Sequence, residues 1–293
     1  MTHARIIALT LLAMIAFAGN SLLCRAALKH TAIDAASFTT IRLISGAIVL
    51  WLVVRMKHGR GTGRGNWLSA CALFAYAAGF SFAYVSLPAA TGALLLFGAV
   101  QATMIGHGLW SGERLVKLQL IGLLLAAGGL VGLLLPGLSA PPLLGSLLML
   151  GAGVAWGVYS LRGKGAGDST RVTAGNFLRA APIAVALSLL MVDKASLDQG
   201  GFWYAVASGA LASGLGYAVW YTALPALKAT TAATVQLSVP VIAALGSIVF
   251  LGEAMSLRLI LASMAILGGI TLVIFEKPSA SGTPPSIPAN RRG

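Results

Sequence analysis

Acidic residues are scarce in this chain: Asp and Glu together number 7 among 293 residues, and charged residues of both signs make up 9%. A soluble domain usually carries about a quarter charged residues, because its surface must be solvated by water. The shortage of charge therefore excludes an ordinary soluble domain. Hydrophobic residues reach 58%, and the 36 glycines suit membrane helices whose backbones approach closely. The composition predicts an integral membrane protein.

Cysteine and histidine are also rare, with 2 and 4 residues. The apolar pattern places Cys24 and Cys71 near opposite membrane faces, too far apart for a disulfide, so both are interpreted as small packing residues. Only His107 lies inside an apolar run, which leaves a histidine-based metal site without a second imidazole. No metal and no cofactor are expected.

Apolar runs close to the ~20 residues needed to cross a bilayer recur along the chain. Ten such runs are predicted to be transmembrane helices, at roughly 5–27, 35–55, 66–86, 91–111, 117–135, 142–162, 172–192, 201–222, 229–250 and 256–275. The expected fold is all-α. The last segment, 278–293, is polar and rich in Pro, Ser and Gly, and we expect it to be a disordered cytoplasmic tail.

Basic residues are distributed unequally between the two sides of these spans. Thirteen Lys and Arg fall on the side of the first residues, whereas the other side holds three, namely Lys29, Lys194 and Arg258. By the positive-inside rule both termini are cytoplasmic. The net charge of +13, concentrated in connectors such as 55–66, is then matched to anionic lipid headgroups. Nucleic acid is not expected as a partner, because no basic folded domain is present to bind it.

A Leu-Pro step occurs twice between apolar runs, at Leu87-Pro88 and at Leu224-Pro225. Four further matches keep the same order at nearly the same offset: Arg25 with Arg162, Arg42 with Arg179, Gly112-Glu113 with Gly252-Glu253, and Gly128-Gly129 with Gly268-Gly269. The chain therefore divides into two five-helix halves, 1–137 and 138–277. Because five is odd, the halves enter the membrane from opposite sides, which is the inverted repeat of secondary transporters.

Prolines mark the expected moving parts. The breaks at Pro88 and Pro225 are interpreted as one gate element for each side of the membrane. Pro240 lies near the middle of the ninth run, where it removes a backbone donor and bends the helix. We expect it to act as a hinge.

The string ALPALKATTAATVQLSVPVIAALGSIVFLGE at 223–253 and the Gly-Glu pair that ends the fourth and ninth runs resemble the EamA-type drug/metabolite transporter superfamily. The resemblance covers about residues 5–275. The first-half strings AGNSLLCRAAL (18–28) and FTTIRLISG (38–46) are similar to the YddG-type aromatic amino acid exporters. The resemblance implies export of amino acids or related small metabolites across a bacterial inner membrane.

A membrane enzyme is the contrasting class. The string GAGD at 165–168 matches intramembrane aspartyl proteases, but that chemistry needs a second buried Asp, and the string falls in a polar loop. No sensory domain follows the spans either. The remaining alternative to amino acid export is a transporter for another small metabolite or drug.

All seven acids fall in loops or at helix ends. A transporter of cations usually needs a carboxylate near the midplane, so neutral or zwitterionic cargo is favoured.

Arg42 and Arg179 are the charged residues placed deepest in their helices. Each could be an anchor for a substrate carboxylate, or a structural charge that snorkels or pairs at a helix end. The structural reading is favoured for both, and likewise for Glu113 and Glu253.

Polar and aromatic side chains at mid-depth form the last group. A polar group facing lipid is costly, so these residues should face other helices or a cavity. Any one of them could instead join two helices. We expect an aromatic, weakly polar substrate cavity lined by Asn20, Tyr76, Phe80, Gln101, Trp156, Tyr217, Gln236 and Ser238.

Overall fold

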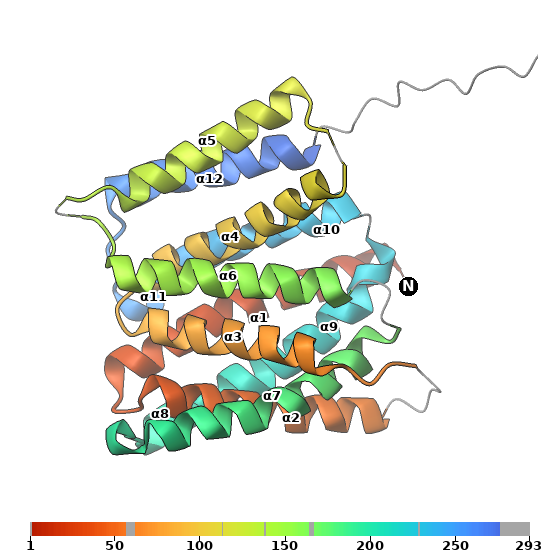
Figure 1. The fold of residues 1–293 in the computed structure, drawn as a ribbon, viewed down its shortest axis with the longest axis vertical. Helices are drawn as coiled ribbons and strands as arrows, with labels where there is room; N and C mark the ends of the chain where they lie inside the picture. The colour runs from red at the N-terminus through yellow and green to blue at the C-terminus, as the bar shows by residue number, and fades with distance from the viewer. Residues whose placement is uncertain are drawn as a thin grey trace, which may run out of the picture.

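The computed structural model describes residues 2–56, 62–112, 114–137, 139–163, 167–227 and 229–275, and within these ranges it is helical with no strand. Figure 1 shows the helices running side by side between two faces. The predicted tail 278–293, Glu113 and part of the basic loop 55–66 lie outside the described residues. The first half contributes α1 (His3–His30), α2 (Ala35–Met56), α3 (Trp67–Tyr84), α4 (Ala89–Trp110) and α5 (Lys117–Leu134).

The second half is less regular than the first. Its uninterrupted helices are α6 (Leu143–Gly163), α7 (Ser169–Leu190) and α12 (Leu257–Phe275). The eighth crossing consists of α8 (Gln199–Ala207), a π-helical segment η2 (Ser208–Leu215) and α9 (Gly216–Ala223), and the ninth consists of α10 (Ala229–Gln236) and α11 (Ser238–Leu251). Short 3₁₀ turns, η1 (Val192–Lys194) and η3 (Leu224–Ala226), complete the connections.

Nine helices in the described part of the chain are long and apolar enough to cross a membrane. The predicted run 201–222 forms a tenth crossing, but the π segment divides it into shorter pieces. The all-helical multi-pass fold is therefore confirmed. Small residues explain the irregular segment: η2 lies so close to α2 that a Cβ on Gly209 would overlap the backbone carbonyl of Arg42.

The ninth crossing is interrupted at Leu237, three residues before Pro240. A proline has no N–H to donate to the carbonyl four residues earlier, and its ring clashes with that carbonyl. That carbonyl belongs to Gln236, the residue at which α10 ends. The interruption is held by local bonds, since the Leu237 amide and the Ser238 hydroxyl donate to the Thr234 and Val235 carbonyls.

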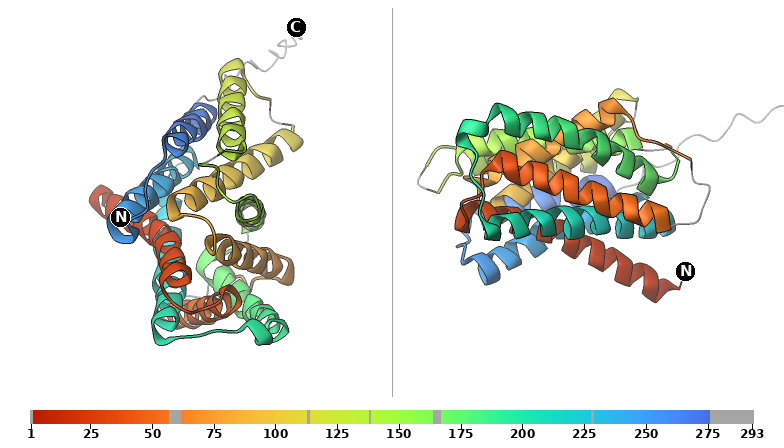
Figure 2. Two further views of the ribbon diagram at one scale, coloured as in Figure 1. Left: turned by 90° about the vertical axis from the view of Figure 1, so that its left-hand side faces the viewer. Right: turned by 90° about the horizontal axis from the view of Figure 1, so that it is seen from below.

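Two groups of packed helices mark the ends of the molecule. At one end α5 and α12 pack along each other, and at the other end α2 packs against α7 and α8 (Figures 1 and 2). Glycines allow the first contact, because a Cβ on Gly122 or Gly269 would collide with the backbone of the facing helix. The space between these two groups is filled by other helices, among them α1, α3, α4, α6 and α9.

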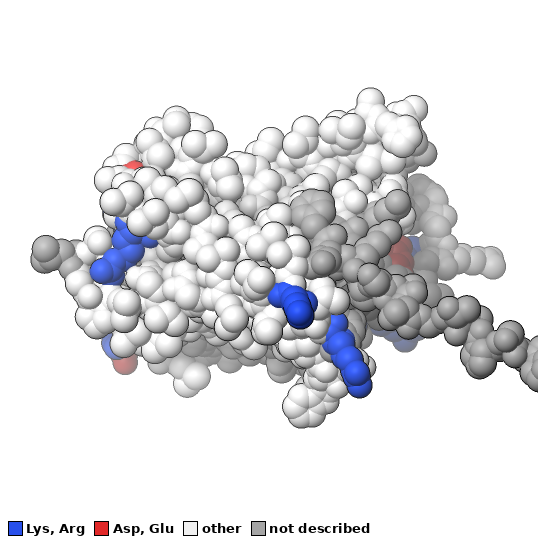
Figure 3. All heavy atoms as spheres, turned by 90° about the horizontal axis from the view of Figure 1, so that it is seen from above, with Lys and Arg blue, Asp and Glu red and all other residues white. Residues whose placement is uncertain are grey.

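The side formed by α5 and α12 is mostly uncharged, with Lys and Arg side chains at a few places (Figure 3). Large apolar side chains are exposed there, among them Ile121, Leu124 and Leu261. A water-soluble protein rarely exposes so large an apolar surface, whereas lipid chains accept it.

The two cysteines differ in burial. Cys71 is exposed, so the interpretation of this cysteine as a packing residue is wrong, whereas the buried Cys24 packs inside the bundle.

Candidate functional site

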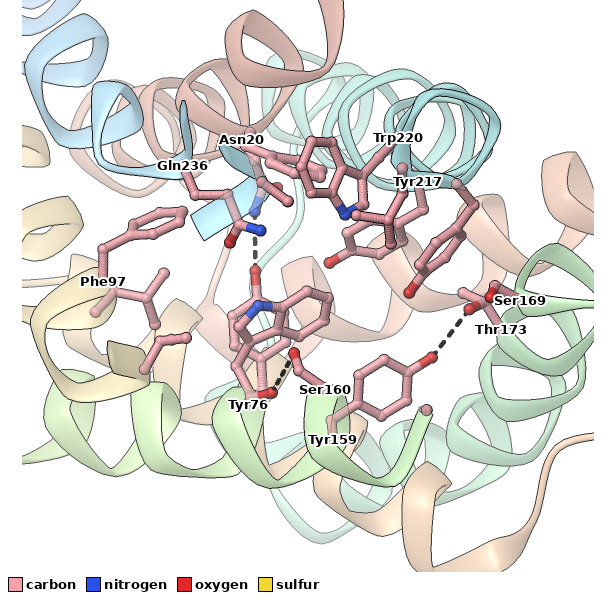
Figure 4. Close-up of a pocket in the computed structure, with 18 of the residues that line it drawn as sticks. Asn20, Tyr76, Phe97, Tyr159, Ser160, Ser169, Thr173, Tyr217, Trp220 and Gln236 are labelled. Carbon is pink, nitrogen blue, oxygen red and sulfur yellow. Dashed lines mark hydrogen bonds between the residues drawn. The ribbon is translucent and has the colours of Figure 1, made fainter. Parts of the chain in front are cut away.

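A cavity of about 410 Å³ lies between the helices of both halves (Figure 4). Its walls come from α1, α3, α4, α6, α7, η2, α9, η3 and α10. This volume falls within the range of ~300–1,000 Å³ typical of small-molecule sites. The cavity is thus large enough for one small metabolite.

The cavity reaches one face of the molecule. Its lining includes Ser69 at the start of α3, Gly163 at the end of α6, Ser169 at the start of α7 and Leu224 just beyond α9. These helix ends share the face on which α1 begins at His3, which we call the amino-terminal face. Among the described residues that line the cavity, none is at a helix end on the opposite face.

The opposite face is held together by an ion pair. The Arg25 guanidinium lies 2.9 Å from the Glu253 carboxylate, and both side chains are mostly buried. Arg25 also donates to the carbonyls of Tyr84 and Val85, and the second Glu253 oxygen accepts the Ala89 amide at 2.7 Å. Because Ala89 follows Pro88 at the first turn of α4, the pair joins α1, α3, α4 and the end of α11.

Arg42 and Arg179, which the predicted repeat makes equivalent, lie in different surroundings. Arg179 donates to the carbonyls of Gly175 and Arg64 near the amino-terminal face, as a structural charge would. Arg42 neither snorkels nor pairs at a helix end, so that expectation is wrong for this residue: its side chain is 1% exposed. It is enclosed by the rings of Tyr76 and Phe80, whose centroids lie 5.1 and 4.8 Å from its guanidinium carbon.

Aromatic rings form one continuous wall of the cavity. Trp156 lies between Tyr159 and Tyr217, with centroid distances of 5.2 Å to each and interplanar angles of 23° and 19°. Tyr76 lies 4.8 Å from the same indole, and Phe17 lies 5.6 Å from Tyr217. Such a wall offers ring faces and edges on which an apolar or aromatic group can pack.

A chain of hydrogen bonds crosses the deep end of the cavity. Ser208 donates to the Asn20 oxygen at 2.7 Å, and the Asn20 amide donates to the Tyr76 hydroxyl at 3.3 Å (Figure 4). Arg42 donates to the same hydroxyl at 2.9 Å and to Ser213 at 3.3 Å. These five residues come from α1, α2, α3 and η2, so the chain fixes four segments around one point.

Seven of the eight residues expected in a substrate cavity line this one: Asn20, Tyr76, Phe80, Gln101, Trp156, Tyr217 and Gln236. Ser238 does not, because its hydroxyl is turned back onto the Val235 carbonyl at 2.6 Å. Pro88, Pro225 and Pro240 do not line it either and lie at helix boundaries or in the ninth crossing. That the seven residues bind cargo stays a prediction.

The sequence reasoning missed the contribution of α7. Ser169, Val172, Thr173 and Asn176 line the cavity and recur at the spacing of one helical face. The predicted run began at 172, which left Ser169 in a loop and drew attention to mid-depth positions only. Trp220 and Tyr221, three and four residues after Tyr217, also line the cavity and could have been found from the same spacing.

The polar groups that the cavity offers to a bound molecule are neutral in its described lining. Among the described residues no three His, Cys, Asp or Glu side chains gather into a metal site. The described residues of the lining supply hydroxyls, amides and rings, and none of them is Asp or Glu. The amides of Gln101 and Gln236 make no hydrogen bond to other residues in the described part, so both are available to a ligand.

The molecule is a helical membrane bundle with a central cavity. The cavity reaches one face and an ion pair closes the opposite face, which is the arrangement expected of a carrier. The comparisons agree, and the chain belongs to the EamA-like transporter family, whose model matches residues 143–275. It is 59% identical to the uncharacterised protein PA1977 of Pseudomonas aeruginosa over 94% of this chain and 96% of that protein.

A second relative is the threonine/homoserine exporter RhtA of Salmonella typhimurium, 33% identical over 46% of this chain and 48% of its own. A solved crystal structure with 19% identity superposes with a TM-score of 0.65 over 93% of this chain and 98% of that one, which shows a shared fold. These similarities point to a membrane transporter and not to an enzyme.

Proposed function

We propose that this protein is a secondary transporter that exports amino acids, above all aromatic or other large apolar ones, across a bacterial inner membrane by alternating access. The observation that carries the proposal is the composition of the cavity wall. The lining combines a row of aromatic rings with neutral amides and hydroxyls, and its described residues include no carboxylate. Rings suit an apolar side chain, and amides suit the polar head of an amino acid.

The charge of the surroundings argues against cationic cargo. A permanently cationic drug needs a carboxylate in or beside its site, as proton-coupled exporters of such compounds provide. Here the nearest buried charge is the positive guanidinium of Arg42. A cation would thus be repelled by Arg42, and no carboxylate among the described lining residues would offset this repulsion.

Alternating access is supported by the packing of matched helices. We take the two halves as inverted repeats: α5 packs on α12 and α2 on α7, and these are the pairs that a two-fold axis in the membrane plane would bring together. The Arg25–Glu253 pair closes one side while the cavity reaches the other. In the mirrored state the cavity would reach the side now closed.

The side facing the cytoplasm follows from the basic residues. If both termini are cytoplasmic, as the positive-inside rule requires, the amino-terminal face is cytoplasmic and the structure represents the inward-facing state. The basic connectors of that face then lie against anionic lipid headgroups. Cargo would enter from the cytoplasm, as export requires.

Export of small polar amino acids is the second candidate, because RhtA is named a threonine/homoserine exporter. The experiment is uptake of labelled Phe, Trp, Leu, Met, Thr and Lys into proteoliposomes that contain the purified protein. We expect Phe, Trp, Leu and Met to be carried well and Lys poorly. Transport of Thr alone would favour the second candidate, and equal transport of Lys and Phe would contradict the proposal.

A further inference from the structure

Arg42 is a buried cation without a counter-ion among the described residues. The ion pairs found there join Arg25 to Glu253 and Arg171 to Asp168, and neither involves Arg42. Burying an unpaired charge is costly, and charged residues within membrane spans mark functional sites by default. Two aromatic rings and two hydroxyls compensate the charge in part.

One terminal nitrogen of the Arg42 guanidinium makes no hydrogen bond. Nε donates to Ser213 and one terminal nitrogen donates to Tyr76, whereas the other terminal nitrogen, Nη1, is buried and has no hydrogen-bond partner. A guanidinium carries five N–H donors and no acceptor. Among the described residues the buried guanidinium therefore lacks both an acceptor for Nη1 and a counter-ion, and it lies behind Tyr76 and Phe80, which line the cavity while Arg42 itself does not.

The Tyr76 hydroxyl carries the effect of this charge to the cavity. It accepts hydrogen bonds from Arg42 at 2.9 Å and from Asn20 at 3.3 Å, which uses both oxygen lone pairs. Its own proton has no acceptor in the described part of the chain. Tyr76 lines the cavity (Figure 4), and two donors on its oxygen make this hydroxyl a stronger donor in turn.

We propose that the Tyr76 hydroxyl, positioned and polarised by the buried guanidinium of Arg42, is the subsite for a single carboxylate group of the cargo. The inference rests on the proposed export of amino acids and specifies which end of the molecule is recognised. A monocarboxylate matches one positive charge, whereas a dianionic phosphate would leave a negative charge uncompensated. The cargo's apolar side chain then lies along the rings of Trp156 and Tyr217.

The test uses two probes that share a ring and chain length but carry opposite charges, 3-phenylpropionate and phenethylamine. Their affinities are measured by calorimetry on the full-length protein in lipid nanodiscs. We expect 3-phenylpropionate to bind at least about tenfold more tightly than phenethylamine. Tyr76→Phe, which keeps the ring, is expected to bring this ratio close to one.

Two kinds of variant separate the subsite from a merely structural role. Tyr84→Phe is the matched control, because Tyr84 is on the same helix, is buried and does not line the cavity, and its hydroxyl donates to the Ala89 carbonyl. It should keep the ratio of the parent. Arg42→Lys should keep the sign of the preference and Arg42→Gln should lose it; if Arg42→Gln does not fold, Tyr76→Phe and Arg42→Lys carry the test.

Equal binding of the two probes by the parent, or an unchanged ratio in Tyr76→Phe, would overturn the carboxylate subsite. Labelled phenylalanine uptake, measured in parallel, tests the proposed function separately. Preference for 3-phenylpropionate without phenylalanine transport would support the subsite and contradict the amino acid assignment. Phenylalanine transport with equal binding of both probes would support the amino acid assignment and contradict the carboxylate subsite.

Discussion

The guanidinium of Arg25 and the carboxylate of Glu253 lie 2.9 Å apart although 228 positions separate them in the sequence. The same carboxylate also accepts the Ala89 amide at the start of α4. One acidic side chain thus ties the two halves together at the face opposite the cavity mouth.

The energetic coupling of this pair can be measured by a double-mutant cycle with Arg25→Gln and Glu253→Gln. We expect a coupling of about 0.5–3 kcal/mol in unfolding experiments, because the groups are in contact and largely buried. The control cycle is Asp193→Asn with Lys194→Gln, two exposed neighbours in η1. A coupling near zero for Arg25 and Glu253 would show that the pair does not hold this face closed.

The orientation of the chain is tested with reporter fusions. A reporter placed after Lys164 should be cytoplasmic and one placed after Lys194 should be outside, because α7 separates the two positions and the basic residues gather on the first side. Reporters that detect the same compartment at both positions would contradict the inverted repeat.

Removing ring surface from the cavity should weaken binding of aromatic cargo. Trp156→Ala or Tyr217→Ala is expected to lower the affinity for phenylalanine threefold to tenfold or more, since an aromatic contact is worth about 0.5–1.5 kcal/mol beyond its buried area. Concentration-dependent uptake into proteoliposomes measures this effect. Trp203→Ala is the control, because Trp203 is 59% exposed on α8 and does not line the cavity. Identical uptake by all three variants would show that these rings only pack helices.

The stability of the protein should depend on the ionisation of Asp34. Partial burial acts to raise the pKa of this carboxyl, but hydrogen bonds from Ser37, Ser196 and Ala36 outweigh it and hold the pKa below its ordinary value. A lowered folded-state pKa stabilises the fold above the unfolded-state pKa of about 4 and stops doing so as pH falls through the folded-state value.

The melting temperature of Asp34→Ala should therefore lie below that of the parent at pH 7, and the gap should narrow below about pH 4. Asp193→Ala, at an exposed position, provides the comparison. If the difference in melting temperature between the parent and Asp34→Ala did not change with pH, the ionisation of Asp34 would not contribute to stability.

Pro240→Ala tests the hinge in the ninth crossing. Alanine restores an N–H that can bond the Gln236 carbonyl, so α10 and α11 should join and the melting temperature should rise. We expect slower uptake at the same time. Pro182→Ala is the matched control, since Pro182 lies within α7, which is continuous from Ser169 to Leu190. Unchanged uptake by Pro240→Ala would exclude a hinge there.

The spanning helices and the position of each residue along its helix could be predicted from the sequence, because both depend on local properties. The length of an apolar run and the charges at its ends decide where a helix crosses. For the same reason Trp156 and Gln236 were recognised as mid-depth residues, and both line the cavity. Depth alone did not distinguish Ser238, whose hydroxyl bonds to its own helix.

Only the tertiary structure decided which way each helix turns its faces. The predicted repeat makes Arg42 and Arg179 equivalent, yet Arg42 is enclosed by Tyr76, Phe80 and Ser213. Arg179 instead donates to the Arg64 carbonyl in the connector before α3 and to the Gly175 carbonyl of its own helix. No local pattern separates them, because their surroundings are supplied by helices distant in sequence. The stripe of α7 that lines the cavity was missed for the same reason. A sequence determines how deep a side chain lies in the membrane, and the packing of helices far apart in the chain determines what that side chain faces.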